Sequence, residues 1–282
     1  MVLESLVGVE DSRLHPYKLF FLAAIGTTVA IIITYLLNQK GFFLVLLVVL
    51  SLLPIMLKQL RYEEKRKESH HFWRYLYKLK FIHRHRELVT DYFYIILGVA
   101  ITIAAFYIML PPGVCCNIFS DQIMTISQIT KQSSGECGLS GSMTKTTGRL
   151  MEGGIFSKIL FNNIGVVIIC FAFSLFYSSG AIFLISWNAS VLGIVVGQGA
   201  KQLLGLPSIP LVLLSYLPHG IPEFLGYILA GIAGGILSVA LARHKEEKEH
   251  FMFVLKDSLL LLCVSLLFVL IGTIIEVSVI AA

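Results

Sequence analysis

The sequence predicts an all-α protein, a polytopic bundle of about seven transmembrane helices. Three observations lead to this prediction. The 282 residues are 56% hydrophobic and only 14% charged, whereas a soluble domain has about 25% charged residues. The mean hydropathy of the chain is +0.83. Several apolar stretches are about twenty residues long, which is enough to cross a bilayer core of roughly 30 Å.

Polar turns separate most of the predicted spans. The spans are expected at Tyr17 to Leu37, Phe42 to Leu57, Asp91 to Leu110, Ile159 to Tyr177, Ala181 to Ala200, residues 218–242, and Phe251 to about Ile280. A tight turn at Asn38 to Gly41 makes residues 1–57 an N-terminal transmembrane hairpin. The very short turn Ser178 to Gly180 predicts that the fourth and fifth spans pack antiparallel.

Residues 58–88 form a basic segment between the second and third spans. Ten Lys and Arg residues lie between Lys58 and Glu87, and this excess of positive charge predicts a cytoplasmic location. Aromatic residues such as Trp73 and Tyr77 alternate with the charges, which predicts an amphipathic helix lying on the inner leaflet. Such a run can also bind nucleic acid. Phospholipid headgroups already explain it between two spans, so no nucleic acid partner is expected.

Residues 114–158 are rich in Ser, Thr and Gly and poor in Lys and Arg, which predicts an extracytoplasmic loop. Alternation of the spans then places the N-terminus in the cytoplasm and the C-terminus outside the cell membrane. The loop holds three cysteines. A disulfide from Cys137 to Cys115 or Cys116 is expected on this oxidising side, and three unpaired thiols are the alternative.

Two prolines open the sixth span. Proline lacks an N–H and suits the first turn of a helix, so Pro218 and Pro222 predict a broken helix at the Pro-His-Gly-x-x-Glu entry. The regular helix is expected to begin at Pro222, with residues 201–216 as an outer or re-entrant segment. If it begins at Pro218 instead, His219 and Glu223 share one helix face. Both are ionisable groups inside the membrane, where they are costly unless paired, hydrated or used.

Polar residues at one depth of the spans predict a cavity open to the outer side. The candidate binding residues are Asn162, Asn163, Asn188, Gln198, Lys201, His219, Glu223 and Glu276, of which only Asn188 lies deeper. Structural alternatives are an interhelical clasp for the Asn pair and a polar staple for His219 with Glu223. A metal site made of His219, Glu223 and Glu276 is the weakest reading, because zinc sites usually contain two histidines at a fixed spacing. The sequence identifies no cofactor.

Small residues recur four apart in two spans, at Ala189, Gly193 and Gly197 and at Gly226, Ala230, Gly234 and Ser238. Small residues allow membrane helices to approach closely. The pattern predicts that both ridges bury against neighbours in a compact core of the fourth to seventh spans.

A set of short motifs indicates a family. They are His85-Arg-Glu87, Phe161-Asn-Asn163, Gly180-Ala-Ile-Phe183, Trp187-Asn-Ala-Ser-Val191, Pro218-His-Gly-Ile-Pro-Glu223, Gly231 to Ser238, and Ile275-Glu-Val277. From about His85 to the C-terminus the chain resembles the stage II sporulation protein M family of integral membrane proteins, in its archaeal-type form. The resemblance implies a multi-helix transmembrane core at residues 89–282. It also implies protein partners, since the name-giving member works with cell-wall hydrolases during engulfment in spore-forming bacteria.

Three functions are compatible with these observations. A non-enzymatic membrane anchor or assembly component is favoured by the resemblance and by the absence of a nucleophile with a neighbouring base. A transporter or channel for an ion or small solute is favoured by the intramembrane carboxylates, the histidine and the broken helix. An intramembrane metal-dependent hydrolase is the third. The expected partners are membrane lipids, a protein in the membrane or at the cell surface, and a second copy of the chain.

Overall fold

The computed structural model describes residues 15–68, 81–130, 154–177, 180–243 and 248–281. Inside a bilayer the backbone must satisfy its own hydrogen bonds, and the apolar stretches accordingly form helices. The helices are α3 (Tyr17–Leu36), α4 (Gly41–Glu68), α5 (Phe81–Met109), α6 (Pro112–Ile118), α7 (Ser120–Thr130), α8 (Gly154–Tyr177), α9 (Ala181–Gln202), η2 (Leu206–Ser208), α10 (Ile209–Arg243) and α11 (Lys248–Ala281). The described ranges contain no strand, and the predicted all-α class is confirmed.

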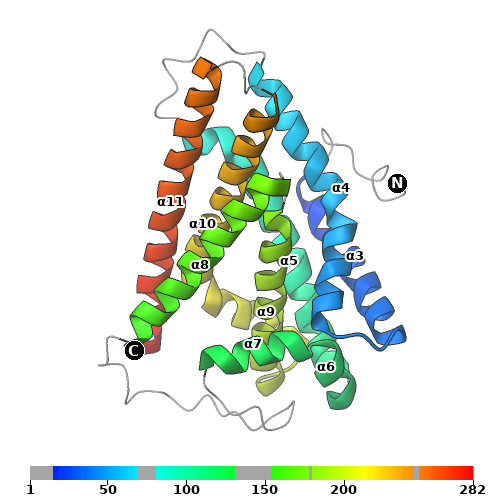
Figure 1. Cartoon of the computed structure of the whole chain (residues 1–282). Coiled ribbons are helices and arrows are strands. Elements are labelled where there is room, and N and C mark those ends of the chain that lie inside the picture. The colour runs from blue at the N-terminus through cyan, green and yellow to red at the C-terminus, as the bar shows by residue number, and fades with distance from the viewer. Residues whose placement is uncertain (1–14, 69–80, 131–153, 178–179, 244–247, 282) are drawn as a thin grey trace.

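Seven helices of the described chain are long and apolar enough to cross a membrane: α3, α4, α5, α8, α9, α10 and α11. Figure 1 shows that they run alternately up and down. Helices α6 and α7 lie at the same end of the bundle as the C-terminal end of α11, and the end of α10 meets the beginning of α11 at the other end. The predicted polytopic bundle is therefore confirmed.

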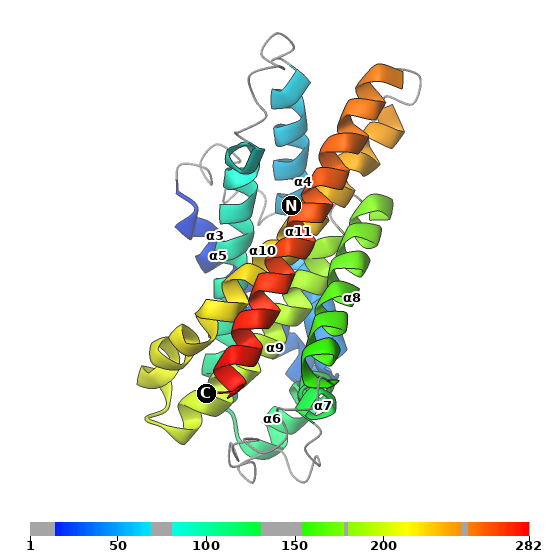
Figure 2. The same ribbon diagram turned by 90° about the vertical axis from the view of Figure 1, so that its left-hand side faces the viewer.

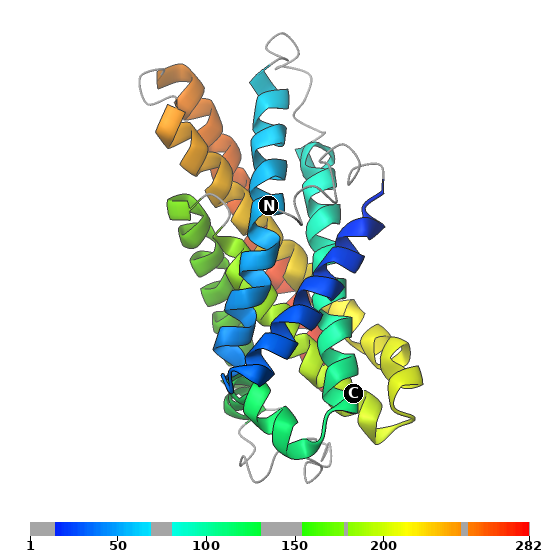
Figure 3. The ribbon, with the colours of Figure 1, turned by 90° about the vertical axis from the view of Figure 1, so that its right-hand side faces the viewer.

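Two inner helices, α9 and α10, organise the packing. Helix α9 contacts α5 and α4, whereas α10 contacts α8 and α11, as the side views in Figures 2 and 3 show. Of the α10 span, 72% is buried, against 22% of the α8 span. Helix α10 is thus the centre of its half of the molecule, and α8 lies at the periphery.

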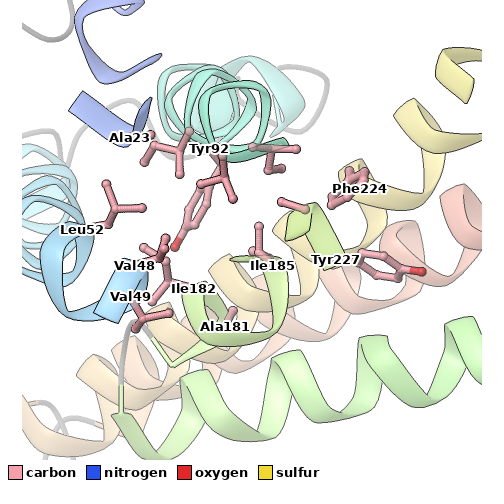
Figure 4. Close-up of a cluster of buried hydrophobic side chains, with 14 of the residues drawn as sticks. Ala23, Val48, Val49, Leu52, Tyr92, Ala181, Ile182, Ile185, Phe224 and Tyr227 are labelled. Carbon is pink, nitrogen blue, oxygen red and sulfur yellow. The ribbon is translucent and has the colours of Figure 1, made fainter. Parts of the chain in front are cut away.

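The apolar core fills the space between α3, α4, α5 and α9. Figure 4 shows the ring of Tyr92 from α5 extending between Val48 of α4 and Ile182 of α9. These residues are at most 2% exposed. Leu52 and Ala23 extend the same cluster toward α4 and α3. The N-terminal hairpin is therefore part of one hydrophobic core with the rest of the bundle.

Glycines set the closest helix contacts, but the partners differ in part from those predicted. On α10, Gly234 faces the backbone of Phe171 in α8, and Gly226 faces the backbone of Ser265 in α11, as predicted. On α9, Gly193 instead packs on α5, where an added Cβ would lie 2.7 Å from the carbonyl oxygen of Ala100. The predicted core of the fourth to seventh spans is wrong in this respect, because the third span supplies the surface that covers the α9 ridge.

The predicted break in the sixth span is also wrong. Helix α10 begins at Ile209 and keeps both Pro218 and Pro222 in its interior. The irregular backbone is confined to residues 203–208, where Gly205 has a positive φ of 74°. Figure 1 shows that the first turns of α10 lie at an angle to the remainder. Proline removes one helical hydrogen bond and bends the helix, and packing against neighbouring helices lets a membrane helix continue through it.

Two predicted connecting segments are partly helical. Helix α4 continues past the membrane span to Glu68, and α5 begins at Phe81. Residues 69–80, the centre of the predicted amphipathic helix, lie outside the described residues. The predicted outer loop contains α6 and α7, and α8 begins at Gly154. Apolar positions such as Ile118 and Phe119 in the first part of this segment are fully buried, which explains why it folds against the bundle.

Helices α6 and α7 hold the turn between α3 and α4. The Asp121 carboxylate accepts a hydrogen bond of 2.7 Å from the backbone N–H of Phe42, where the free N–H groups at the beginning of α4 favour an acceptor. The side-chain amide of Gln122 donates to the carbonyl oxygen of Gly41 at 3.1 Å. The end of the N-terminal hairpin is thereby fixed to the segment that follows α5.

The disulfide prediction can be tested for two of its three cysteines. Cys116 is disulfide-bonded, whereas Cys115 is a buried free thiol. Cys116 is therefore not an unpaired thiol, whereas the predicted pairing with Cys137 stays a prediction. Cys137, the predicted partner, lies outside the described residues.

Cys115 is expected to react slowly with iodoacetamide in the folded protein. Burial raises the pKa of its thiol to about 11, and the nearby Lys201 opposes this shift only in part. Because the thiolate is the nucleophile, alkylation at pH 8 should be on the order of a hundredfold slower than for a thiol of ordinary pKa. The rate should rise as the pH approaches 11. Mass spectrometry of the modified peptide measures the rate, with the SDS-unfolded protein as control, and equal rates in both states would contradict the expectation.

Candidate functional site

Glu223 of α10 lies at a close contact between α10 and α11. An added Cβ at Gly272 of α11 would lie 2.6 Å from Cγ of Glu223 and 3.1 Å from the carbonyl oxygen of His219. One turn further along, the hydroxyl of Ser265 donates to the carbonyl oxygen of Gly226 at 2.7 Å. The absence of a side chain at Gly272 therefore lets α11 approach the part of α10 that carries the predicted site residues.

Asn163 of α8 is the centre of a hydrogen-bond network. Its side chain is only 5% exposed. Its Nδ2 donates to Oε1 of Glu223 at 2.8 Å and, more weakly, to the hydroxyl of Thr273 at 3.4 Å. Its Oδ1 accepts a hydrogen bond of 3.0 Å from the hydroxyl of Tyr227. One amide thus connects α8, α10 and α11, and both of its polar atoms are in use.

Glu276 of α11 completes this arrangement. Its carboxyl group lies within hydrogen-bonding reach of the carboxyl group of Glu223. We refer to Asn163, Glu223, Tyr227, Thr273 and Glu276 as the polar cluster. Asn163, Tyr227 and Thr273 are buried, and the two glutamates are half-buried. Figure 4 shows the hydroxyl of Tyr227 directed away from the labelled apolar side chains. The cluster therefore forms a polar centre among three membrane helices.

His219 lies beside this cluster on α10. It precedes Glu223 by one turn of the continuous helix, so the two residues share a face, as one of the two predicted geometries requires. The imidazole contacts the ring of Tyr216 edge-on, with ring centroids 5.7 Å apart. Its Nδ1 is buried and has no hydrogen-bond partner. A buried polar atom without a partner is unfavourable, so His219 retains a hydrogen-bonding capacity that its neighbours in the structure do not use.

Besides His219, four of the predicted site residues are not members of the polar cluster. Asn162 is exposed and donates only a long 3.3 Å hydrogen bond to Asn163. Asn188 donates to the carbonyl oxygen of Leu184 within α9 at 2.8 Å. Gln198 donates to the hydroxyl of Tyr107 at 3.2 Å, and the Lys201 ammonium lies 5.8 Å from the centre of the same ring.

The structure therefore separates the predicted site residues into two groups and one isolated residue. One group lies between α8, α10 and α11, the other joins α5 to α9 through Tyr107, and Asn188 bonds within its own helix. A single cavity shared by all of them and open to the outer side stays a prediction.

Sequence reasoning missed Tyr227, Thr273 and Tyr107. Sequence spacing could have predicted the first two. Tyr227 follows Glu223 by four residues and Thr273 precedes Glu276 by three, so each lies on the same helix face as the neighbouring glutamate. Tyr107 could not have been found in this way. Its link to Gln198 spans 91 residues and depends on how α5 packs on α9.

The described side chains do not form a metal site at His219, Glu223 and Glu276. Within the described part of the chain, no group of three or more His, Cys, Asp or Glu side chains is placed to hold a metal ion. His219, Glu223 and Glu276, the weakest of the sequence-based alternatives, therefore do not converge on a common point. A hydrolase that depends on a metal at these residues has no support in this arrangement.

The fold and the polar cluster define a multi-pass membrane protein in which buried polar side chains join α8, α10 and α11. The chain belongs to the stage II sporulation protein M family, whose family model matches residues 93–279. The match begins within α5 and ends within α11, so it contains the whole polar cluster and leaves out α3 and α4. The resemblance inferred from the sequence motifs is confirmed. No curated protein and no solved structure matches the chain significantly.

Proposed function

We propose that this chain is a non-enzymatic component of the cell membrane that anchors or assembles partner proteins at the cell surface. The observation that carries the proposal is that the buried polar side chains hydrogen-bond one another. Asn163 has hydrogen bonds at both amide atoms, and they hold α8, α10 and α11 together. Such a network favours a rigid three-helix body, which suits a protein whose task is to hold partners in place.

The proposed orientation has the N-terminus and the basic segment 58–88 in the cytoplasm. Helices α6 and α7 and the C-terminus are then extracytoplasmic. Two independent observations support this orientation. Positive charge gathers in the segment between α4 and α5, and Cys116 at the opposite end is disulfide-bonded, as is usual on an oxidising side. The partners are membrane lipids, a protein at the outer surface or within the membrane, and a second copy of the chain, with no role for nucleic acid.

The test is purification of the tagged full-length chain from its native membranes in a mild detergent. A partner protein is expected at constant stoichiometry. Because the His219 side chain is partly exposed beside the polar cluster, His219→Ala should reduce the amount of partner retained at least threefold. The exposed Asn162→Ala serves as the control and should leave the amount unchanged. If the chain purifies alone, or if both variants retain the partner equally, the proposal fails.

Transport of an ion or small solute is the second candidate. The specific observation in its favour is the contact between two carboxyl groups inside the bundle, because ionisable residues within membrane spans usually mark ion or solute pathways. In proteoliposomes a transporter would show a flux that Glu223→Gln abolishes. No flux above that of protein-free vesicles, for protons, Na⁺ or K⁺, would count against an ion transporter and favour the anchor.

A further inference from the structure

The contact between Glu223 and Glu276 has a chemical requirement. An ionised carboxylate has only acceptor atoms, so two carboxyl groups can hydrogen-bond each other only when one of them carries a proton. Two ionised carboxylates in contact would repel each other strongly in apolar surroundings. The placement of the two carboxyl groups within hydrogen-bonding reach of each other therefore requires a proton between them.

Among the described residues, the groups around the pair support one negative charge on it, and no cation lies beside it. Asn163 donates its Nδ2 to Oε1 of Glu223 at 2.8 Å and thereby stabilises an ionised oxygen there. The titratable groups near the pair are the hydroxyls of Tyr216 and Tyr227, the imidazole of His219, and the thiol of Cys170, which is close to Tyr227. Lys201, which could offset a second negative charge, lies in the other group with Tyr107.

The close packing of α11 on α10 brings Glu223 and Glu276 together. Gly272 lets α11 lie against the backbone of His219 and Glu223, and Ser265 bonds the carbonyl oxygen of Gly226 one turn away. The fully buried Thr273 of α11 hydrogen-bonds Asn163 of α8 beside the two carboxyl groups. Because Gly272 brings α11 against Glu223, repulsion between two ionised carboxyl groups would act at this helix contact.

We infer that Glu223 and Glu276 form a binding site for a single proton, which the two carboxyl groups share and which joins α10 to α11. With the proton bound, the pair carries one negative charge that Asn163 stabilises. When the proton leaves to water, two carboxylates face each other across the α10–α11 contact. The site holds whether the protein anchors partners or moves a solute, because it depends only on the contacts among α8, α10 and α11.

Infrared spectroscopy tests the inference directly. The full-length protein is purified at pH 7 in dodecyl maltoside, which has no carbonyl group, and the carbonyl stretching band of a protonated carboxyl group is recorded in H₂O and D₂O. The wild type should show this band, and the band should shift in D₂O. Glu223→Gln and Glu276→Gln should each abolish it, because the new amide donates to the remaining carboxylate. Glu87→Gln, at the beginning of α5, is the matched control and should keep the band.

Three outcomes would overturn the inference. The wild type could lack the band, both single variants could keep it, or Glu87→Gln could remove it. If a glutamine variant fails to fold, as judged by gel filtration, an alkaline titration of the wild type replaces it. The protonated band should then disappear as the carboxylate band grows, and together with this change the protein should become easier to unfold in SDS. Loss of the band with unchanged SDS resistance would overturn the link to the α10–α11 contact.

Discussion

Replacing Asn163 with leucine is expected to destabilise the protein by about 2–4 kcal/mol, because buried polar groups that lose a partner cost about 1–3 kcal/mol each. The amide donates to Glu223 and Thr273 and accepts from Tyr227. Leucine has a similar volume but no polar atom, so the carboxyl oxygen of Glu223 and the hydroxyl of Tyr227 would stay buried without their partner. The free energy of unfolding is measured by SDS titration of the purified protein.

The neighbouring residue provides a matched control for this change. Asn162 has the same side chain, lies on the same turn of α8, and is exposed. Within the described ranges, its side chain makes one hydrogen bond, to Asn163, which is 3.3 Å long. Asn162→Leu should therefore change the free energy of unfolding by no more than about 0.5 kcal/mol, as is usual for a surface substitution. Equal effects of the two substitutions would show that Asn163 does not link the three helices.

Gly234→Leu is expected to lower the stability by about 3 kcal/mol or more, since an overpacked core position costs typically 1–3 kcal/mol and occasionally more. An added Cβ at Gly234 would overlap the carbonyl oxygen of Phe171 and lie 3.0 Å from the backbone nitrogen of Leu175. These are backbone atoms of α8 and cannot rotate away. Accommodating leucine requires α8 to move from α10, and this movement would also stretch the hydrogen bond from Asn163 to Glu223.

Gly165→Leu is the control for this substitution. Gly165 lies within α8, as Gly234 lies within α10, but an added Cβ there would meet nothing within 4 Å. Leucine should be tolerated or slightly stabilising at Gly165, because it favours a helix by about 1 kcal/mol over glycine. Gly193→Leu, whose Cβ would approach the backbone of Ala100 in α5, should behave like Gly234→Leu. Melting in detergent compares the three variants, and similar melting temperatures would refute the packing described for α9 and α10.

Much of the candidate site could be named from the sequence because the membrane makes polar residues conspicuous. Asn163, Glu223 and Glu276 stand in apolar stretches where each ionisable or amide group is unfavourable without a partner. Their mutual contacts could not be predicted, since Asn163 and Glu223 are 60 residues apart and Asn163 and Thr273 are 110 apart. Gln198 and Lys201 have the same polarity and the same predicted depth, yet the packing of α9 on α5 directs them to Tyr107 instead.

The prolines of α10 show how local rules can mislead. Pro218 and Pro222 each remove a helical hydrogen bond, and this local loss predicted that the helix begins at Pro222. The helix begins at Ile209. Contacts that are distant in the sequence favour continuation, because α11 packs along the same turns through Gly272 and the buried Val269. These contacts between α10 and α11 stabilise the continuous helix, and they cannot be predicted from residues 209–224 alone.

The sequence by itself determined the class of the protein, its seven spans and its family. These properties depend on the length and polarity of contiguous stretches. Each membrane-spanning segment must by itself be apolar, long enough to cross the bilayer, and able to satisfy its backbone hydrogen bonds. The tertiary structure alone decided which polar side chains meet, which helix covers each glycine, and that α10 continues through its prolines. Those features arise from close packing between segments far apart in the chain, where a shift of a few ångströms decides whether Glu223 meets Glu276 or faces lipid.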